Sequence, residues 1–131
     1  MYLRFVLPGK HPDTGFDEGV FAVAYALRRE GELLDHEWFE LDELLRWFGT
    51  NLAIPNRFNR SKSKGYYRRT TKGVSWFKHS ATKHLTKMHR MAEILGNHGH
   101  HVTMIKTARP GYIVYEDAIQ VVAEPFNDLR K

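Results

Sequence analysis

The chain has 131 residues, of which 42% are hydrophobic and 27% are charged, and these values are typical of one folded domain and exclude a disordered chain. It contains no cysteine, which excludes disulfides, thiolate metal ligands and cysteine nucleophiles. The formal net charge of +5 favours anionic partners.

The first β-strand is predicted at residues 1–7, because Leu3, Phe5 and Leu7 recur with a period of two. Pro8 and Gly9 end this apolar run. It is too short for a signal peptide or a membrane span. The sequence therefore predicts a cytoplasmic protein that makes no membrane contact.

Two helices are predicted after a loop at residues 8–15. The first covers 17–30, where Thr14 or Asp17 would cap its start and acidic residues would fill its first turn. Its middle is apolar on nearly every side, so we expect it to be buried between layers. The second, at 42–48, would be capped by Asp42, and residues 38 and 39 fit either a helix or an extended chain. Its expected core residues are Leu41, Leu44, Leu45 and Phe48.

Residues 51–73 lack regular periodicity and predict a long basic loop. A third helix is predicted at 74–97 from a stripe of apolar residues spaced by three and four. That stripe consists of Phe77, Ala81, Leu85, Met88, Ala92 and Leu95. We expect a cationic ridge on the opposite face of this helix, formed by His79, Lys83, Lys87 and Arg90.

Three further strands are predicted at 101–107, 112–115 and 119–124, with turns at 109–111 and at Glu116-Asp117. The predicted order is β-α-α-α-β-β-β. We expect an α+β fold in which about three helices pack against a mainly antiparallel four-stranded sheet. The whole chain, 1–131, is predicted to be a single domain.

Charge is divided along the chain. Residues 13–43 hold ten acidic residues and two arginines, a balance of −8, whereas residues 57–90 hold eleven lysines and arginines and no acid, a balance of +11. One interpretation is that the two regions pair within the fold. The other is that the basic region faces outward and binds an anion. Both fit the sequence.

The basic loop and the cationic ridge together form a candidate polyanion site, because phosphate binding requires several cations on one surface. Arginine can hold phosphate through two hydrogen bonds, and aromatic rings between the cations can stack on unpaired bases. The alternative is that Phe58 and Trp76 are core anchors and that the cations are a solvated face. The predicted nucleic-acid-binding residues are Arg57, Arg60, Lys62, Lys64, Tyr66, Tyr67, Arg68, Arg69, Lys78, Lys83, Lys87 and Arg90.

Other motifs give no catalytic residue, metal ligand or cofactor. A zinc-protease motif at His36-Glu37 fails because Glu40 stands where its second histidine belongs. Gly9-Lys10 lacks the remaining residues of a phosphate-binding loop. His79, His84 and His89 are spaced by five and so do not share one helix face. These three and the remaining histidines, His98, His100 and His101, are interpreted as loop and surface residues.

Several segments resemble a group of small bacterial proteins to which no function is assigned. The resemblance touches about half of the chain, implies a bacterial source and a standalone domain, and transfers no catalytic residue. The resembling pieces are Trp47-Phe48 with Asn51-Leu52 and Pro55, Arg57-Phe58 with Arg60-Ser61, Ser75 to Lys78, Arg109 to Tyr112, and Gln120 to Phe126.

The leading hypothesis is a non-enzymatic protein that binds DNA or RNA through the basic loop and the basic helix face. The first alternative is a protein-interaction module, or a small inhibitor protein from a mobile element, that recognises an acidic protein surface. The second is a small enzyme with an unrecognised site near the basic loop. The sequence assigns no oligomeric state.

Overall fold

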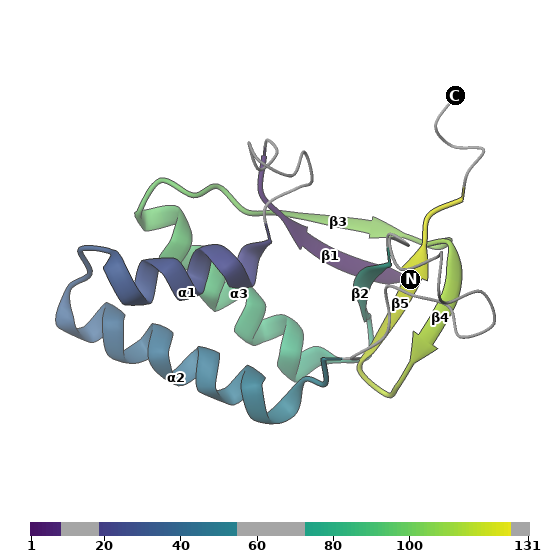
Figure 1. Cartoon of the computed structure of the whole chain (residues 1–131), viewed down its shortest axis with the longest axis horizontal. Coiled ribbons are helices and arrows are strands. Elements are labelled where there is room, and N and C mark those ends of the chain that lie inside the picture. Colours follow the sequence, from purple (N-terminus) through teal and green to yellow (C-terminus); the bar gives the residue numbers. More distant parts are fainter. Residues whose placement is uncertain (9–18, 55–72, 127–131) are drawn as a thin grey trace, which may run out of the picture. The chain divides into compact units, whose positions relative to one another are not determined.

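The computed structural model describes residues 1–8, 19–54 and 73–126. These residues form three helices and five strands in the order β-α-α-β-α-β-β-β (Figure 1). The α+β class is confirmed, and the sheet has five strands rather than four. The elements are β1 Tyr2–Val6, α1 Val20–Glu30, α2 Asp35–Asn51, β2 Val74–Lys78, α3 Thr82–Asn97, β3 Thr103–Thr107, β4 Tyr112–Glu116 and β5 Gln120–Glu124.

The chain divides into two compact units. The helical unit comprises Phe5–Ala53 and Lys83–Ile105, and the sheet unit comprises Met1–Arg4, Ile54–Thr82 and Lys106–Lys131. The division runs through β1 and β3, so each unit is built from segments that are far apart in the sequence. A single domain over 1–131 stays a prediction.

The strand that the sequence analysis missed is β2. Residues 74–78 were predicted to begin the third helix, but they form a strand that pairs with β1 and β5, and α3 begins only at Thr82. The spacing of Phe77, Ala81 and Leu85 imitates a helical stripe. Residues 74–78 are too few to show a strand period, since the apolar Trp76 and Phe77 are adjacent. Their ladders with β1 and β5 make them a strand.

The five antiparallel strands are arranged in the order β3-β1-β2-β5-β4. The buried alternation predicted for the first strand is confirmed, since Leu3, Phe5 and Leu7 are all buried. In the sheet unit, β5 is the most buried strand, and Val121, Val122 and Ala123 have no exposed surface. The hairpin predicted at Glu116-Asp117 is also present, because β4 and β5 pair antiparallel on either side of it.

In the helical unit, α1 begins later than predicted. Gly19 precedes its first turn, which contains no acidic residue, whereas Thr14 and Asp17 lie outside the described residues. The expectation of burial on nearly every side is wrong, since Tyr25 is exposed. The apolar run therefore reflects one buried face and several small or amphipathic residues on the other.

The helix α2 has 17 residues and is much longer than the predicted 42–48. Its start is set by Glu37, whose carboxylate accepts a hydrogen bond from the backbone amide of Leu34 at 3.2 Å. Asp42 was predicted to be the cap but lies within the helix, where it pairs with Arg28 and Arg46. The predicted core residues Leu41, Leu44, Leu45 and Phe48 are confirmed as buried.

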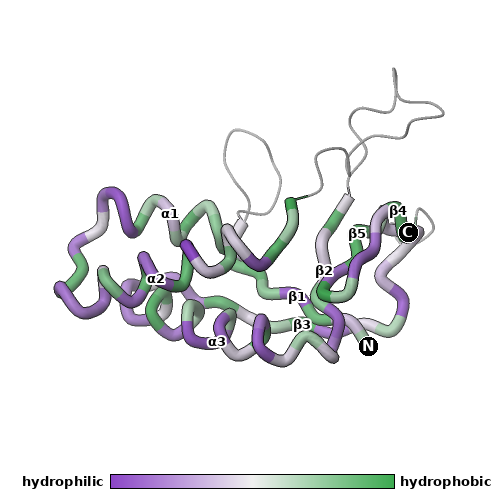
Figure 2. Tube along the Cα trace, turned by 90° about the horizontal axis from the view of Figure 1, so that it is seen from below, coloured by the Kyte–Doolittle hydropathy of each residue, from purple (hydrophilic) through white to green (hydrophobic). Residues whose placement is uncertain are grey.

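The buried side of α3 differs from the predicted stripe. It consists of His84, Met88, Met91, Ile94 and Leu95, while Leu85 and Ala92 are only half-buried. Along α2 and α3 the chain changes repeatedly between hydrophobic and hydrophilic residues, the pattern of helices with one apolar face (Figure 2). Within the described residues, no helix is long and apolar enough to cross a membrane.

Candidate nucleic-acid interface

The structure describes four of the twelve predicted contact residues. Lys78 belongs to the sheet unit, and Lys83, Lys87 and Arg90 belong to α3 of the helical unit. The other eight lie outside the described residues: Arg57, Arg60, Lys62, Lys64, Tyr66, Tyr67, Arg68 and Arg69. Each described cation therefore has to be judged by its own surroundings.

Arg90 is committed to carboxylates within the helical unit. Its guanidinium donates to both carboxylate oxygens of Glu40 and to Glu93 at 2.5 Å. These hydrogen bonds raise the pKa of Arg90 above its already high value and lower the pKa of Glu40. A phosphate would have to displace two carboxylates to bind this arginine.

Lys87 is positioned by an aromatic ring. Its ammonium lies 5.0 Å from the centre of the Trp47 ring, a cation–π arrangement. Trp47 packs edge-on against His84, whose Nε2 lies 2.8 Å from the carbonyl oxygen of Asn51. The interpretation of His84 as a loop or surface residue is therefore wrong. It is a buried, hydrogen-bonded residue of α3, and it packs against the ring on which Lys87 rests.

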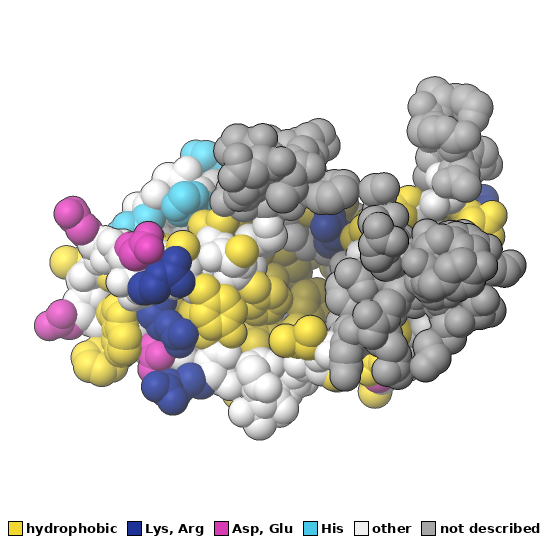
Figure 3. Space-filling view, viewed as in Figure 1, with side chains coloured by type: hydrophobic (Ala, Val, Ile, Leu, Met, Phe, Trp, Pro, Cys, Tyr) yellow, Lys and Arg dark blue, Asp and Glu magenta, His cyan; other side chains and the backbone are white. Residues whose placement is uncertain are grey.

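Lys83 is exposed, and no ion pair links it to another described residue. The three cations of α3 do not stand opposite its buried side as predicted. Their row, 83, 87 and 90, continues four residues later at the buried Ile94, so it borders the apolar face. On the face drawn in Figure 3, lysine and arginine side chains of the helical unit lie beside acidic and hydrophobic ones.

The sheet unit presents a second cationic and aromatic cluster. Because Tyr2 is the ladder partner of Lys78, the antiparallel register brings Arg4 opposite Trp76 on the same face of the sheet. The Arg4 guanidinium lies 6.0 Å from the centre of the Trp76 ring. Lys78 forms an ion pair of 2.7 Å with Glu116 of β4.

Trp76 is half-buried, and its indole N–H has no hydrogen-bond partner among the described residues. A buried donor without a partner costs about 1–3 kcal/mol, so the position is not optimised for stability alone. The ring faces Arg4 on a sheet face that also carries Lys78. This arrangement combines a planar aromatic surface with two cations.

The acidic region pairs in part with the basic region inside the helical unit. Glu40 binds Arg90 of the basic region, whereas Asp42 binds two arginines that lie outside that region, Arg46 and Arg28, each at 2.8 Å. The hydrogen bond from Arg46, followed by the charges of both arginines, lowers the pKa of Asp42. Among the described residues, pairing between the two regions is seen for Glu40 with Arg90, and it removes Arg90 from the freely available cations.

The histidines are dispersed over different partners. His98 Nε2 lies 3.0 Å from a carboxylate oxygen of Glu37, and this hydrogen bond lowers the pKa of Glu37. His79 lies near the carbonyl oxygen of Met1, and the ring of His89 packs edge-on against Phe5. In the part of the chain that the structure describes, no three potential ligands are grouped to hold a metal ion.

Sequence reasoning missed Arg4 as a partner of Trp76 and Glu40 as the partner of Arg90. The first depends on the pairing of β1 with β2, which the five residues of β2 do not indicate, because the apolar Trp76 and Phe77 are adjacent and do not alternate with polar residues. No local signal identifies the second, because 50 residues separate Glu40 and Arg90.

Comparisons with protein-family models, with curated proteins and with solved structures find no match to this chain.

Proposed function

We propose that this protein binds nucleic acid, with the phosphates held mainly by the arginines and lysines of residues 57–72. The observation that carries the proposal is the run of cations from Arg57 to Arg90, which no acidic residue interrupts. A polyanion gains affinity from each neutralised phosphate through counterion release, so a continuous run of cations suits it.

The surroundings of the described cations narrow the proposed contact surface. Arg90 is held by two carboxylates and Lys87 rests on Trp47, so these two contribute less than the sequence pattern alone predicts. Lys83 is exposed and remains a phosphate contact in the proposal. Lys78 is likewise held by a carboxylate, that of Glu116, and so it also contributes less. The Arg4–Trp76 pair lies on β1 and β2, and β2 follows directly after the basic segment.

Aromatic residues would add contacts with the bases to the contacts with phosphate. Tyr66 and Tyr67 lie between the cations in the sequence, and Trp76 presents its ring beside Arg4. Stacking of a base on an aromatic side chain contributes about 1–3 kcal/mol and requires an unpaired base. Single-stranded DNA or RNA is therefore the expected preferred form.

The test is a fluorescence-anisotropy titration with labelled single- and double-stranded DNA and RNA at two salt concentrations. We expect tighter binding to a single strand and a steep loss of affinity with salt. Replacing Arg60, Arg68 and Arg69 with glutamine should reduce the slope of log affinity against log salt by about three.

The matched control replaces Arg29, Arg46 and Lys106 with glutamine, which removes the same net charge from exposed positions outside the basic region. Equal loss of affinity in the two triple variants would mean that only net charge matters, and it would reject the assigned residues. Absence of binding by the unaltered protein at low salt would reject the function itself.

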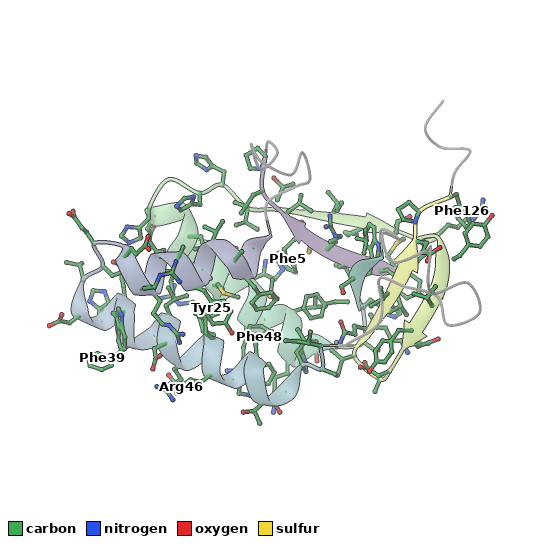
Figure 4. All side chains as sticks on the ribbon, viewed as in Figure 1. Phe5, Tyr25, Phe39, Arg46, Phe48 and Phe126 are labelled. Carbon is green, nitrogen blue, oxygen red and sulfur yellow. The ribbon has the colours of Figure 1, made fainter. Side chains whose placement is uncertain are left out.

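A protein-interaction module is the second candidate, favoured by two exposed apolar side chains of the helical unit. Leu34 is 63% and Phe39 is 67% exposed, and Phe39 lies at the surface of α2 while Phe48 points from the same helix towards α1 (Figure 4). Large apolar residues at such exposure are common at protein interfaces. A stoichiometric protein partner retained after nuclease treatment, and lost on replacing Phe39 with serine, would support this candidate.

A further inference from the structure

The acidic residues of α2 fall into two groups. Glu37, Glu40 and Asp42 are each bonded to a histidine or arginine side chain of the helical unit. The other two, Asp35 and Glu43, are exposed, and neither forms an ion pair with any residue that the structure describes. The acids that α2 turns towards its neighbours are therefore neutralised, whereas these two are open to a partner.

The two unpaired carboxylates lie on either side of an exposed aromatic residue. Asp35, Phe39 and Glu43 are spaced by four residues, so they share one face of α2. The two acids are about 12 Å apart along the helix axis, because each residue rises about 1.5 Å. Phe39 is 67% exposed and lies at the surface of α2 (Figure 4). We call these three residues the acidic–aromatic stripe.

The ring of Phe39 has a fixed neighbour. It packs edge-on against the ring of Trp38, with ring centres 5.3 Å apart. Trp38 is held in turn by its indole N–H, which donates to the backbone oxygen of Arg28 at 2.9 Å. An exposed aromatic side chain that is already ordered loses little conformational entropy on binding, and such side chains dominate the energetics of protein interfaces.

The unpaired charge around Phe39 is negative. Arg46 lies three residues after Glu43, but its guanidinium donates to Asp42 at 2.8 Å. In the loop before α2, Glu32 is also exposed and has no ion pair within the described part of the chain. Asp35 suits the positive end of the helix dipole, a role that leaves its carboxylate accessible.

We propose that the acidic–aromatic stripe docks a basic amphipathic helix of another protein, in which one apolar side chain lies between two arginines or lysines. Cations four residues before and four residues after that side chain would meet Asp35 and Glu43, while the apolar group covers Phe39. The inference rests on protein interaction, the second candidate function, and gives the chemistry of the partner. The same carboxylates repel nucleic acid, so the stripe and the basic segment take different ligands.

The first experiment uses a labelled, alanine-rich helical peptide in which arginine stands four residues before and four residues after a leucine. A control peptide carries glutamate in place of both arginines. Fluorescence anisotropy with the unaltered protein should show saturable binding of the arginine peptide that weakens with salt. The glutamate peptide should not bind at the same concentrations.

Variants of the protein assign the binding to the stripe. Phe39→Ser should lower the affinity for the arginine peptide by about tenfold or more, because it removes the apolar anchor. Asp35→Asn combined with Glu43→Gln should also weaken binding and should remove most of its salt dependence. The matched control combines Glu30→Gln with Glu93→Gln, which removes the same charge from exposed positions of the helical unit outside the stripe.

Circular dichroism shows whether each variant is folded. If Phe39→Ser is unfolded, Glu43→Arg takes its place, since it reverses one exposed charge of the stripe without removing an apolar group. This variant should bind the glutamate peptide more tightly than the unaltered protein does. An unchanged preference for the arginine peptide would overturn the proposal.

Three further results would overturn it. Equal loss of affinity in the two double variants would mean that only net charge matters. Peptide binding that appears only after Arg60, Arg68 and Arg69 are replaced with glutamine would identify the chain's own cations as the occupant. Self-association of the unaltered protein that Phe39→Ser abolishes, measured by sedimentation equilibrium, would identify a second copy.

The nucleic-acid proposal is tested separately on the same proteins. Labelled single-stranded DNA should bind Phe39→Ser as tightly as it binds the unaltered protein. Peptide binding without DNA binding would reject the nucleic-acid function and support the stripe. DNA binding without peptide binding would reject the stripe alone.

Discussion

Arg90 of α3 and Glu40 of α2 form a two-point salt bridge across 50 residues of sequence. The guanidinium also donates to Glu93 of α3. One arginine therefore links α3 to α2 and also bonds to a residue of its own helix. A cation predicted to bind phosphate is therefore part of the internal structure of the helical unit.

Replacing Arg90 with alanine is expected to destabilise the protein by about 1 kcal/mol, because Glu40 loses both hydrogen bonds. Lys83→Ala removes an exposed cation from the same helix and should leave the free energy of unfolding nearly unchanged. Urea denaturation of both variants measures the difference. Equal stability of the two would show that the Arg90–Glu40 pair contributes nothing to the folded state.

The stability of the protein should fall in acid, with Glu40 contributing to the loss. Its pKa is lowered from 4.5, chiefly by the hydrogen bonds from Arg90, so the unfolded state binds a proton more readily. The stabilisation is complete above the ordinary pKa and is lost as pH falls through the lowered one. Glu40→Gln should reduce the slope of unfolding free energy against pH below 4.5.

The control for this pH dependence is Glu43→Gln, an exposed carboxylate on the same helix. Urea denaturation at several acidic pH values compares the two variants with the unaltered protein. A slope that Glu40→Gln leaves unchanged would exclude Glu40 as a contributor. Glu37 and Asp42, whose pKa values are also lowered, should keep part of the slope in the variant.

Gly111 should tolerate no side chain. Its φ is +136°, and a Cβ there would lie 2.2 Å from the backbone oxygen of Glu124. Gly111→Ala is expected to cost more than about 2 kcal/mol, through backbone strain combined with a clash against a paired strand. Gly99→Ala has a positive φ of +89° but nothing within 4 Å, so thermal denaturation should show a smaller loss.

The β4–β5 hairpin should depend on Asp117. Burial alone would raise its pKa, but hydrogen bonds from the Ile119 and Gln120 amides and the Tyr115 hydroxyl lower it overall. Asp117→Ala is expected to destabilise the protein by about 2 kcal/mol, because two backbone donors lose their acceptor. Tyr115→Phe removes one of these bonds, so urea denaturation should show a smaller effect, and an equal effect would contradict the assignment.

The sequence predicts those elements whose hydrophobic spacing or turn residues all lie within one short segment. The alternation of Leu3, Phe5 and Leu7 is sufficient for β1, and the turn residues separate β4 from β5. The strand β2 escapes this reasoning because five residues offer few alternations, and Phe77 also fits a helical spacing to Ala81. Its identity is decided by two ladders with residues far away in the chain, which no local window contains.

The candidate site is less predictable than the fold for a related reason. A basic run in the sequence gives the number of cations but not their partners. Arg90 and Lys78 are both paired with carboxylates from distant segments, Glu40 and Glu116, and these pairings depend on which elements become neighbours. The uninterrupted charge of residues 57–72 remains the part of the site that the sequence itself indicates.

The pairing of β1 with β2 has a consequence for how the protein is made. Tyr2 and Leu3 are synthesised well before their ladder partners Lys78 and Phe77, which follow more than 70 residues later in the chain. The helices α1 and α2 are close in sequence and in contact. They can therefore associate before β2, the ladder partner of β1, has been synthesised. Translation therefore exposes an apolar strand without its neighbours, and synonymous codon changes that slow synthesis before residue 74 should increase aggregation of the nascent chain.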